Sequence, residues 1–286
     1  FNRNHYYLRM WEAVMKIRFF LCLMLILGLT QDTQAPCQDN TSSELIKTGD
    51  EMIQTTARLR GLEPKAAIKK SVKSREEITK YLNERVQAEY GQGELEKEGK
   101  MLRRLGLIPA DMNYREFLIK LLTEQIGGLY DPDKKTFFIA SWLTAEEQKP
   151  VMIHELTHAL QDQYFNVARM IKDDRTIDNG DRQLAHEALL EGDALVVMLN
   201  YLLEPANRHF SQLRDLSFIT QSLMITMESQ YPTLKIAPLY LQQTLLFSYG
   251  YGASFLQYSW TQNPSWQAVN KIYSDLPAST EQIMHP

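Results

Sequence analysis

Apolar residues along most of the chain recur every three or four positions, the spacing of helices that bury one face. Residues 41–90 are charged, yet four of their apolar residues fall at i, i+3, i+4 and i+8: Ile78, Tyr81, Leu82 and Val86. The sequence Gly91-Gln92-Gly93 interrupts this pattern and predicts a joint. We expect packing helices before the joint, with a pro-segment or a wall of a binding site as the alternatives.

Two further helices are predicted between residues 94 and 126, separated by the Gly-Leu-Ile-Pro sequence at 106–109. Asn113 can cap the second of these helices, with Glu116 as its partner. The spacing then changes to that of a β-hairpin, with strands at 127–130 and 136–140 around an Asp-Pro-Asp-Lys-Lys turn. An exposed hairpin edge could bind an extended peptide, and a purely structural hairpin is the alternative.

An apolar helix is predicted directly after the hairpin. The sequence Thr144-Ala145-Glu146-Glu147 offers a capping box, and Pro150 is favoured near a helix start, so we expect the helix at 150–164. Residues 166–181 are polar and predict a loop.

A second long apolar helix is predicted at 182–204, ended by Pro205. Its interior Gly192 costs roughly 1 kcal/mol relative to alanine, and close packing against the 150–164 helix would explain that residue. The remainder, 207–286, reads as helical with a break and restart at the aromatic segment 247–255. The pattern as a whole predicts a mainly helical α+β fold with a small hairpin before the 150–164 helix.

The N-terminus resembles a secretory signal in its composition. Basic residues at Lys16 and Arg18 precede an apolar run at 19–29, and Thr33-Gln34-Ala35 offers a cleavage sequence. The run is short for a membrane span, so we expect an exported protein without stable membrane insertion, with an uncleaved anchor as the alternative. Met15 is then the expected start of translation.

Charge and cysteine content add two expectations. The formal net charge is −4 and no Lys/Arg-rich tract occurs, so nucleic acid is not an expected partner. Cys22 would leave with the signal, and the remaining Cys37 cannot form an internal disulfide. Cys37 as an inhibitory metal ligand is a weaker alternative.

The strongest chemical pattern is H-E-x-x-H at residues 154–158, inside the predicted 150–164 helix. One helical turn separates His154 and His158, so both imidazoles can bind one Zn²⁺. Glu155 beside them is the expected general base, taking a proton from the attacking water. This pattern predicts a catalytic zinc centre with one ion per chain.

A catalytic zinc ion needs a third protein ligand, and the 182–204 helix offers several acids in an apolar context. Buried carboxylates are costly unless paired or metal-bound, which favours one of them as the ligand. The candidates are Glu187, Glu191 and Asp193. His186 is expected to be structural or to support a ligand.

These residues resemble the gluzincin metallopeptidases, in which a glutamate on a following helix completes H-E-x-x-H. The sequence E-G-D-A at 191–194 resembles the aminopeptidase branch and makes Glu191 the ligand. The sequence E-A-L-L-E at 187–191 resembles the thermolysin type and makes Glu187 the ligand. We prefer Glu191, because close approach would explain the glycine that follows it. The spacing from His158 to Glu191 is longer than in the best-known gluzincins.

A closer resemblance is to a group of mostly exported bacterial proteins that share the same order of motifs. The motifs are G-x-Y-D-P, H-E-L-T-H-A-L-Q-D-Q, E-G-D-A, Y-x-x-G-x-x-F and S-T-E-Q-I-x-H-P, here at 128–132, 154–163, 191–194, 249–255 and 279–286. The resemblance covers most of residues 100–286. It implies a metallopeptidase-like site and no particular substrate.

Zinc peptidases also need a donor for the developing oxyanion. Tyr249 is our candidate, and Tyr251 and His285 are alternatives; for each of them an ordinary packing or surface role is the competing interpretation. Asp162 can orient an imidazole, cap a helix or lie at the surface.

The sequence as a whole predicts a zinc metallopeptidase acting on peptides or proteins. A zinc hydrolase of non-peptide amides and a non-catalytic envelope protein with a zinc site are the alternatives. We expect upstream residues and a signal peptide at 1–35 and an N-terminal helical region at 36–93. Residues 94–286 are the expected zincin-like domain, which we expect to continue beyond Pro286.

Overall fold

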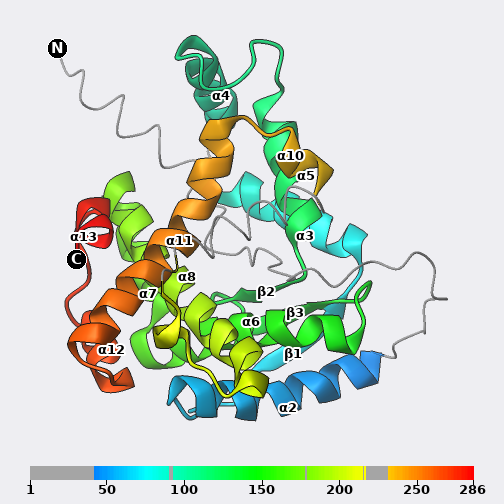
Figure 1. Ribbon diagram of the computed structural model, residues 1–286. Coiled ribbons are helices and arrows are strands. Elements are labelled where there is room, and N and C mark those ends of the chain that lie inside the picture. The colour runs from blue at the N-terminus through cyan, green and yellow to red at the C-terminus, as the bar shows by residue number, and fades with distance from the viewer. Residues whose placement is uncertain (1–41, 90–92, 178, 215, 217–230) are drawn as a thin grey trace.

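The computed structural model describes residues 42–89, 93–177, 179–214, 216 and 231–286 (Figure 1). These residues form mainly helices together with one small sheet, in agreement with the predicted α+β class. The predicted signal peptide, Cys22 and Cys37 lie outside the described residues. Within the described part of the chain, no helix is both long and apolar enough to cross a membrane.

The first half of the described chain contains the three strands of the sheet and helices α2 to α5. The elements are α2 (Ser42–Arg60), β1 (Lys69–Lys73), α3 (Arg75–Glu89), α4 (Glu94–Arg104), α5 (Tyr114–Gln125), β2 (Gly128–Asp131) and β3 (Thr136–Ala140).

The described residues of the second half form helices and connecting turns, without a strand. The elements are α6 (Ala145–Phe165), α7 (Val167–Ile177), α8 (Gly180–Leu203), η1 (Glu204–Ala206), η2 (Phe210–Gln212), α10 (Pro232–Lys235), α11 (Leu239–Gln262), α12 (Trp266–Ile272) and α13 (Thr280–Met284).

The sheet has the order β1-β3-β2, with β3 between its two neighbours. The predicted hairpin is confirmed, since β2 and β3 are antiparallel with Tyr130 opposite Phe137. Strand β1 pairs in parallel with β3, although we expected only helices between 41 and 90. Its sequence, Lys-Lys-Ser-Val-Lys, has one apolar residue, so the strand forms because β3 supplies a hydrogen-bonding edge rather than because of local propensity.

Helix α5 begins as the sequence predicts, because Asn113 accepts a hydrogen bond from the backbone N–H of Glu116. Helix α6 begins earlier than the predicted residue 150. Thr144 and Glu147 form the capping box, and Pro150 lies inside the helix, in its second turn. Proline there removes one backbone donor, and the capping box stabilises the first turn that the prediction omitted.

The predicted loop at 166–181 is wrong, because most of it forms α7. Asn166 adopts a left-handed conformation with φ of 56°, which ends α6 and lets the chain turn at once. Val167, Met170 and Ile171 then pack against Leu190 of α8. Three apolar residues on one face are enough for a helix when a neighbour covers them.

The helix predicted at 182–204 is confirmed as α8, but the break predicted at 247–255 is wrong, because α11 continues through that segment. Gly192 of α8 does pack closely, yet against Gly252 of α11 and not against α6. A Cβ added at Gly192 would lie 2.2 Å from the backbone carbonyl carbon of Gly252. Helix α8 therefore lies between α6 and α11, as Figure 1 shows.

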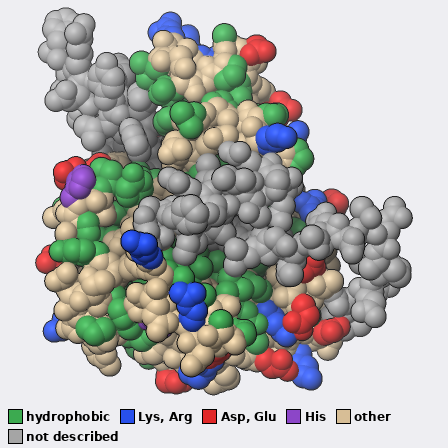
Figure 2. All heavy atoms as spheres, in the orientation of Figure 1, with side chains coloured by type: hydrophobic (Ala, Val, Ile, Leu, Met, Phe, Trp, Pro, Cys, Tyr) green, Lys and Arg blue, Asp and Glu red, His purple; other side chains and the backbone are tan. Residues whose placement is uncertain are grey.

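On the face drawn in Figure 2, basic and acidic side chains alternate, and the described residues form no continuous basic tract there.

Candidate metal centre

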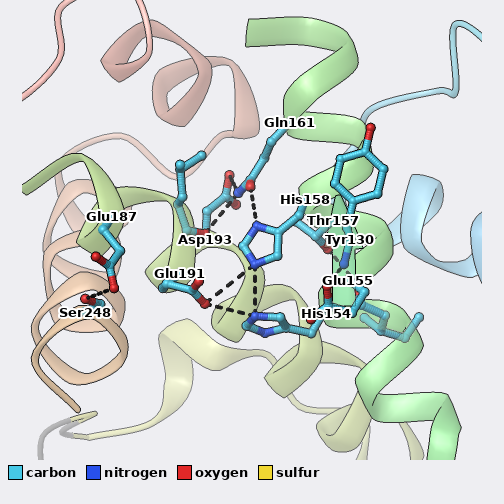
Figure 3. A network of polar contacts seen from close by, with 12 residues as sticks. Tyr130, His154, Glu155, Thr157, His158, Gln161, Glu187, Glu191, Asp193 and Ser248 are labelled. Carbon is cyan, nitrogen blue, oxygen red and sulfur yellow. Dashed lines mark hydrogen bonds and ion pairs between the residues drawn. The ribbon is translucent and has the colours of Figure 1, made fainter. Parts of the chain in front are cut away.

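Helices α6 and α8 bring three predicted metal ligands together (Figure 3). The Nε2 atoms of His154 and His158 lie 3.1 Å apart. Glu191 Oε2 of α8 lies 3.0 Å from His154 Nε2 and 3.5 Å from His158 Nε2. Among the described residues, these three form the group that could hold a metal ion.

Local sequence explains the histidine pair. Positions i and i+4 of a helix share a face, so His154 and His158 point the same way. The buried apolar residues of α6 hold the helix in an orientation in which the two histidines point toward α8. Met152, Leu156 and Ala159 are fully buried on α6. The ligand face is consequently held by the same packing that holds the helix.

The group is strongly coupled electrostatically. Burial raises the pKa of Glu191, but the two imidazoles outweigh burial and lower that pKa to about 2. Burial lowers the pKa of His158, but Glu191 outweighs it and raises that pKa to about 9. For His154 burial prevails and its pKa is lowered. The metal-free centre at neutral pH is therefore a neutral His154, a protonated His158 and an ionised Glu191.

Glu155 lies beside the ligands and is held by the sheet. Its Oε2 accepts a 2.5 Å hydrogen bond from the backbone N–H of Tyr130 in β2. This contact uses the outer edge of β2 at Tyr130, where peptide binding was one of the two alternatives left open by the sequence. All four residues of β2 are buried. The hairpin thus positions the carboxylate that the sequence predicts as the base.

Glu187, the alternative third ligand, lies one turn before Glu191 on α8. Its Oε1 accepts a hydrogen bond from Ser248 Oγ at 3.0 Å, and it is not in the group of three. Glu187, Glu191, His158 and Tyr130 line one small cavity of about 10 Å³, room for about one water molecule. The structure therefore favours Glu191 as the ligand, with Glu187 on the wall of the cavity beside it.

The candidate oxyanion donors are placed very differently. The ring of Tyr249 in α11 stacks on that of His154, with centroids 6.0 Å apart. Tyr251 is 48% exposed, and the exposed His285 lies 4.0 Å from Glu281. Only Tyr249 of the three contacts a residue of the metal centre in the described structure.

Asp162 and His186 support helices instead of ligands. Asp162 accepts hydrogen bonds from the hydroxyl of Tyr130 and from the backbone N–H of Ala168 in the first turn of α7. His186 Nδ1 lies 2.7 Å from Asp174 Oδ2, which joins α8 to α7. Asp162 is thus the helix cap that was one of its predicted roles.

Our sequence interpretation missed Gln161, which contacts a ligand directly. Its Oε1 lies 2.8 Å from His158 Nδ1, and its Nε2 lies 3.1 Å from Asp193 Oδ2. Asp193, a candidate ligand in the sequence, forms instead an ion pair with the buried Arg60 of α2. The available signal was the spacing, because Gln161 follows His158 by three residues and so shares its face.

Comparison with family models, with curated proteins and with solved structures gives no match to this chain. The resemblance to the gluzincins therefore stands as a prediction from the motifs.

Proposed function

We propose that this chain is a zinc-dependent metallopeptidase of gluzincin type, exported from the cell. The observation that carries the proposal is the convergence of His154, His158 and Glu191 beside Glu155. Two imidazoles and one carboxylate are the donor set of one class of catalytic zinc site, which leaves a coordination position for a reactant.

The donor spacing fits the ion. Ligand atoms about 2.0–2.2 Å from a tetrahedral zinc ion lie roughly 3.4 Å from one another. The distances of 3.0, 3.1 and 3.5 Å between the donor atoms are close to that value. Bound there, zinc would polarise the scissile carbonyl and activate a water molecule for attack.

In the proposed reaction Glu155 moves the proton. Its carboxylate takes a proton from the attacking water and returns it to the leaving amine. The Tyr130 N–H fixes one carboxylate oxygen, so the side chain keeps one orientation while the proton moves. Burial of the centre excludes bulk water, which strengthens each of these electrostatic interactions. Tyr249, stacked on His154, is the candidate donor to the developing oxyanion.

The test is Glu155→Gln, which keeps the shape of the side chain and removes its basicity. We expect the purified protein to keep one zinc ion per chain, while hydrolysis of a fluorogenic peptide library falls by about 10²–10⁴-fold. Metal analysis and the cleavage assay are measured on the same preparation.

Glu146→Gln is the matched control, because Glu146 is an exposed acid on the same helix and pairs only with Lys149 in the described contacts. It should leave both readouts unchanged. Full peptide hydrolysis by Glu155→Gln would mean that another group is the base. Zinc binding without cleavage of any peptide by the wild-type protein would contradict the peptidase assignment and leave the metal centre intact.

A further inference from the structure

Gln161 of α6 is a buried polar side chain that connects the metal ligand His158 to Asp193 of α8. It is fully buried and lies one turn after His158. Its Oε1 faces His158 Nδ1 at 2.8 Å, and its Nε2 lies 3.1 Å from the carbonyl oxygen of Leu190 and from Asp193 Oδ2. The same Nε2 also lies 3.1 Å from the hydroxyl of Tyr273. One carboxamide therefore contacts a ligand of α6, two acceptors of α8 and Tyr273.

The partners of Gln161 fix which way its amide points. A backbone carbonyl can only accept a hydrogen bond, and so can an ionised carboxylate. The two acceptors, Leu190 and Asp193, therefore select the NH₂ end, and the oxygen end must face His158. An oxygen there requires His158 to carry a proton on Nδ1. In the neutral form of His158 that binds a metal, the Nε2 lone pair then points toward Glu191 and His154, where the ion would lie.

Asp193 is held in place by contacts from two other parts of the chain. Arg60 of α2 donates to both carboxylate oxygens, Nε to Oδ1 at 2.7 Å and the terminal nitrogen to Oδ2 at 2.9 Å. Tyr273, directly after α12, donates its hydroxyl to Oδ2 at 2.7 Å. Both side chains of the ion pair are completely buried. A paired, bidentate geometry of this kind holds a carboxylate in one position.

We propose that Gln161 is a positioning residue for the metal centre, anchored by Asp193 with its partners Arg60 and Tyr273. It selects the tautomer of His158 and fixes the ring so that Nε2 faces the ion. Groups that orient a ligating histidine in this way commonly contribute 10–100-fold to metal affinity. The inference rests on the metal centre of the proposed function and does not depend on the substrate.

The experiment compares two buried glutamines of the same helix. Gln161→Met removes the amide at nearly constant volume, and Gln148→Met does the same at a residue that donates to Ala140 and contacts no ligand in the described structure. Zinc affinity of the full chain is measured by competition with a chromogenic chelator. We expect about 10–100-fold weaker binding for Gln161→Met and wild-type binding for Gln148→Met.

A second variant separates hydrogen bonding from packing. Tyr273→Phe keeps Gln161 and removes only a hydroxyl that lies 3.1 Å from Gln161 Nε2 and donates to Asp193 Oδ2. It should weaken zinc binding several-fold while the fold is kept, and it provides the test if Gln161→Met does not fold.

The outcomes separate the two proposals. Zinc binding by Gln161→Met equal to wild type would overturn the positioning role, as would equal losses in Gln161→Met and Gln148→Met or wild-type binding by Tyr273→Phe. If the wild-type protein binds no zinc, the metal centre itself is refuted. Zinc binding without peptide cleavage leaves the positioning test fully informative.

Discussion

Helix α8 packs against two long helices in opposite ways. Toward α6 it presents polar side chains, with Glu191 against the two imidazoles and Asp193 against Gln161. Toward α11 it presents a glycine, and the backbones of Gly192 and Gly252 approach directly. Three consecutive residues of α8 thus serve both interfaces.

The comparison shows two ways of fixing a helix in space. At Gly192 and Gly252 no side chain separates the backbones of α8 and α11, so this point of contact tolerates almost no change in volume. The α6–α8 contact instead depends on donors and acceptors that a metal ion could bind, so its strength depends on protons and metal. The first interface sets the position of α8, and the second uses that position for chemistry.

The largest effect is expected from a methyl group in the glycine contact. In Gly192→Ala the new Cβ would lie 2.2 Å from the Gly252 carbonyl carbon and 2.5 Å from its oxygen, both backbone atoms that no rotamer change can move. We expect unfolding free energy to fall by about 3 kcal/mol or more, measured by urea denaturation of metal-free protein.

Gly49→Ala in α2 is the control, because the new Cβ there meets the side chain of Lys70. It should change stability by no more than about 1 kcal/mol. Wild-type stability in Gly192→Ala would show that α8 and α11 can separate without loss, which would remove the contrast between the interfaces.

The polar interface is probed by a pair of isosteric changes one turn apart. Glu191→Gln should weaken zinc binding by more than about 100-fold, since it removes a charged ligand and not merely a supporting group. Glu187→Gln should retain zinc, because Glu187 accepts from Ser248 and lies outside the group of three. Zinc content after dialysis against a weak chelator distinguishes them. The reverse result would establish Glu187 as the third ligand.

A smaller and more specific effect is the number of protons that His158 releases when zinc binds. Because Glu191 raises the pKa of His158 to about 9, His158 is protonated at pH 7.5 in the metal-free protein. Zinc binding requires the neutral imidazole, so about one proton should be released per ion bound. The release should decrease as pH rises through about 9, where His158 is already neutral.

Calorimetric titration with zinc in buffers of different ionisation enthalpy measures this number. The lowered pKa values of His154 and Glu191 mean that neither should contribute a proton. Release of no proton at pH 7.5 would show that the coupling of His158 to Glu191 is weaker than the structure implies.

The sequence predicted the parts of the centre that a single helix determines. His154 and Glu155 are neighbours in one helix and His158 lies one turn later, so helical geometry alone fixes their relative positions. Thr144 caps that helix as expected. Glu191 was preferred over Glu187 for the glycine beside it. That glycine does mark a close approach, but to α11 rather than to α6. The preference for Glu191 agrees with the structure although one of its premises was wrong.

Three predictions of secondary structure were wrong because contacts with distant segments decide whether these elements form. Strand β1 exists because β3 offers an edge, and α7 exists because Leu190 covers its three apolar residues. The aromatic segment 247–255 suggested a break, yet α8 packs directly against Gly252 and the helix is continuous.

Helical periodicity by itself determined a long apolar helix with two histidines one turn apart, and a second helix with several acids. The tertiary structure alone decided which acid meets the imidazoles. Glu187 and Glu191 share one face of α8, and a shift of one turn, about 5.4 Å, would exchange them. That shift is set by the contacts of α8 with α6 and α11, and those contacts join residues far apart in the chain.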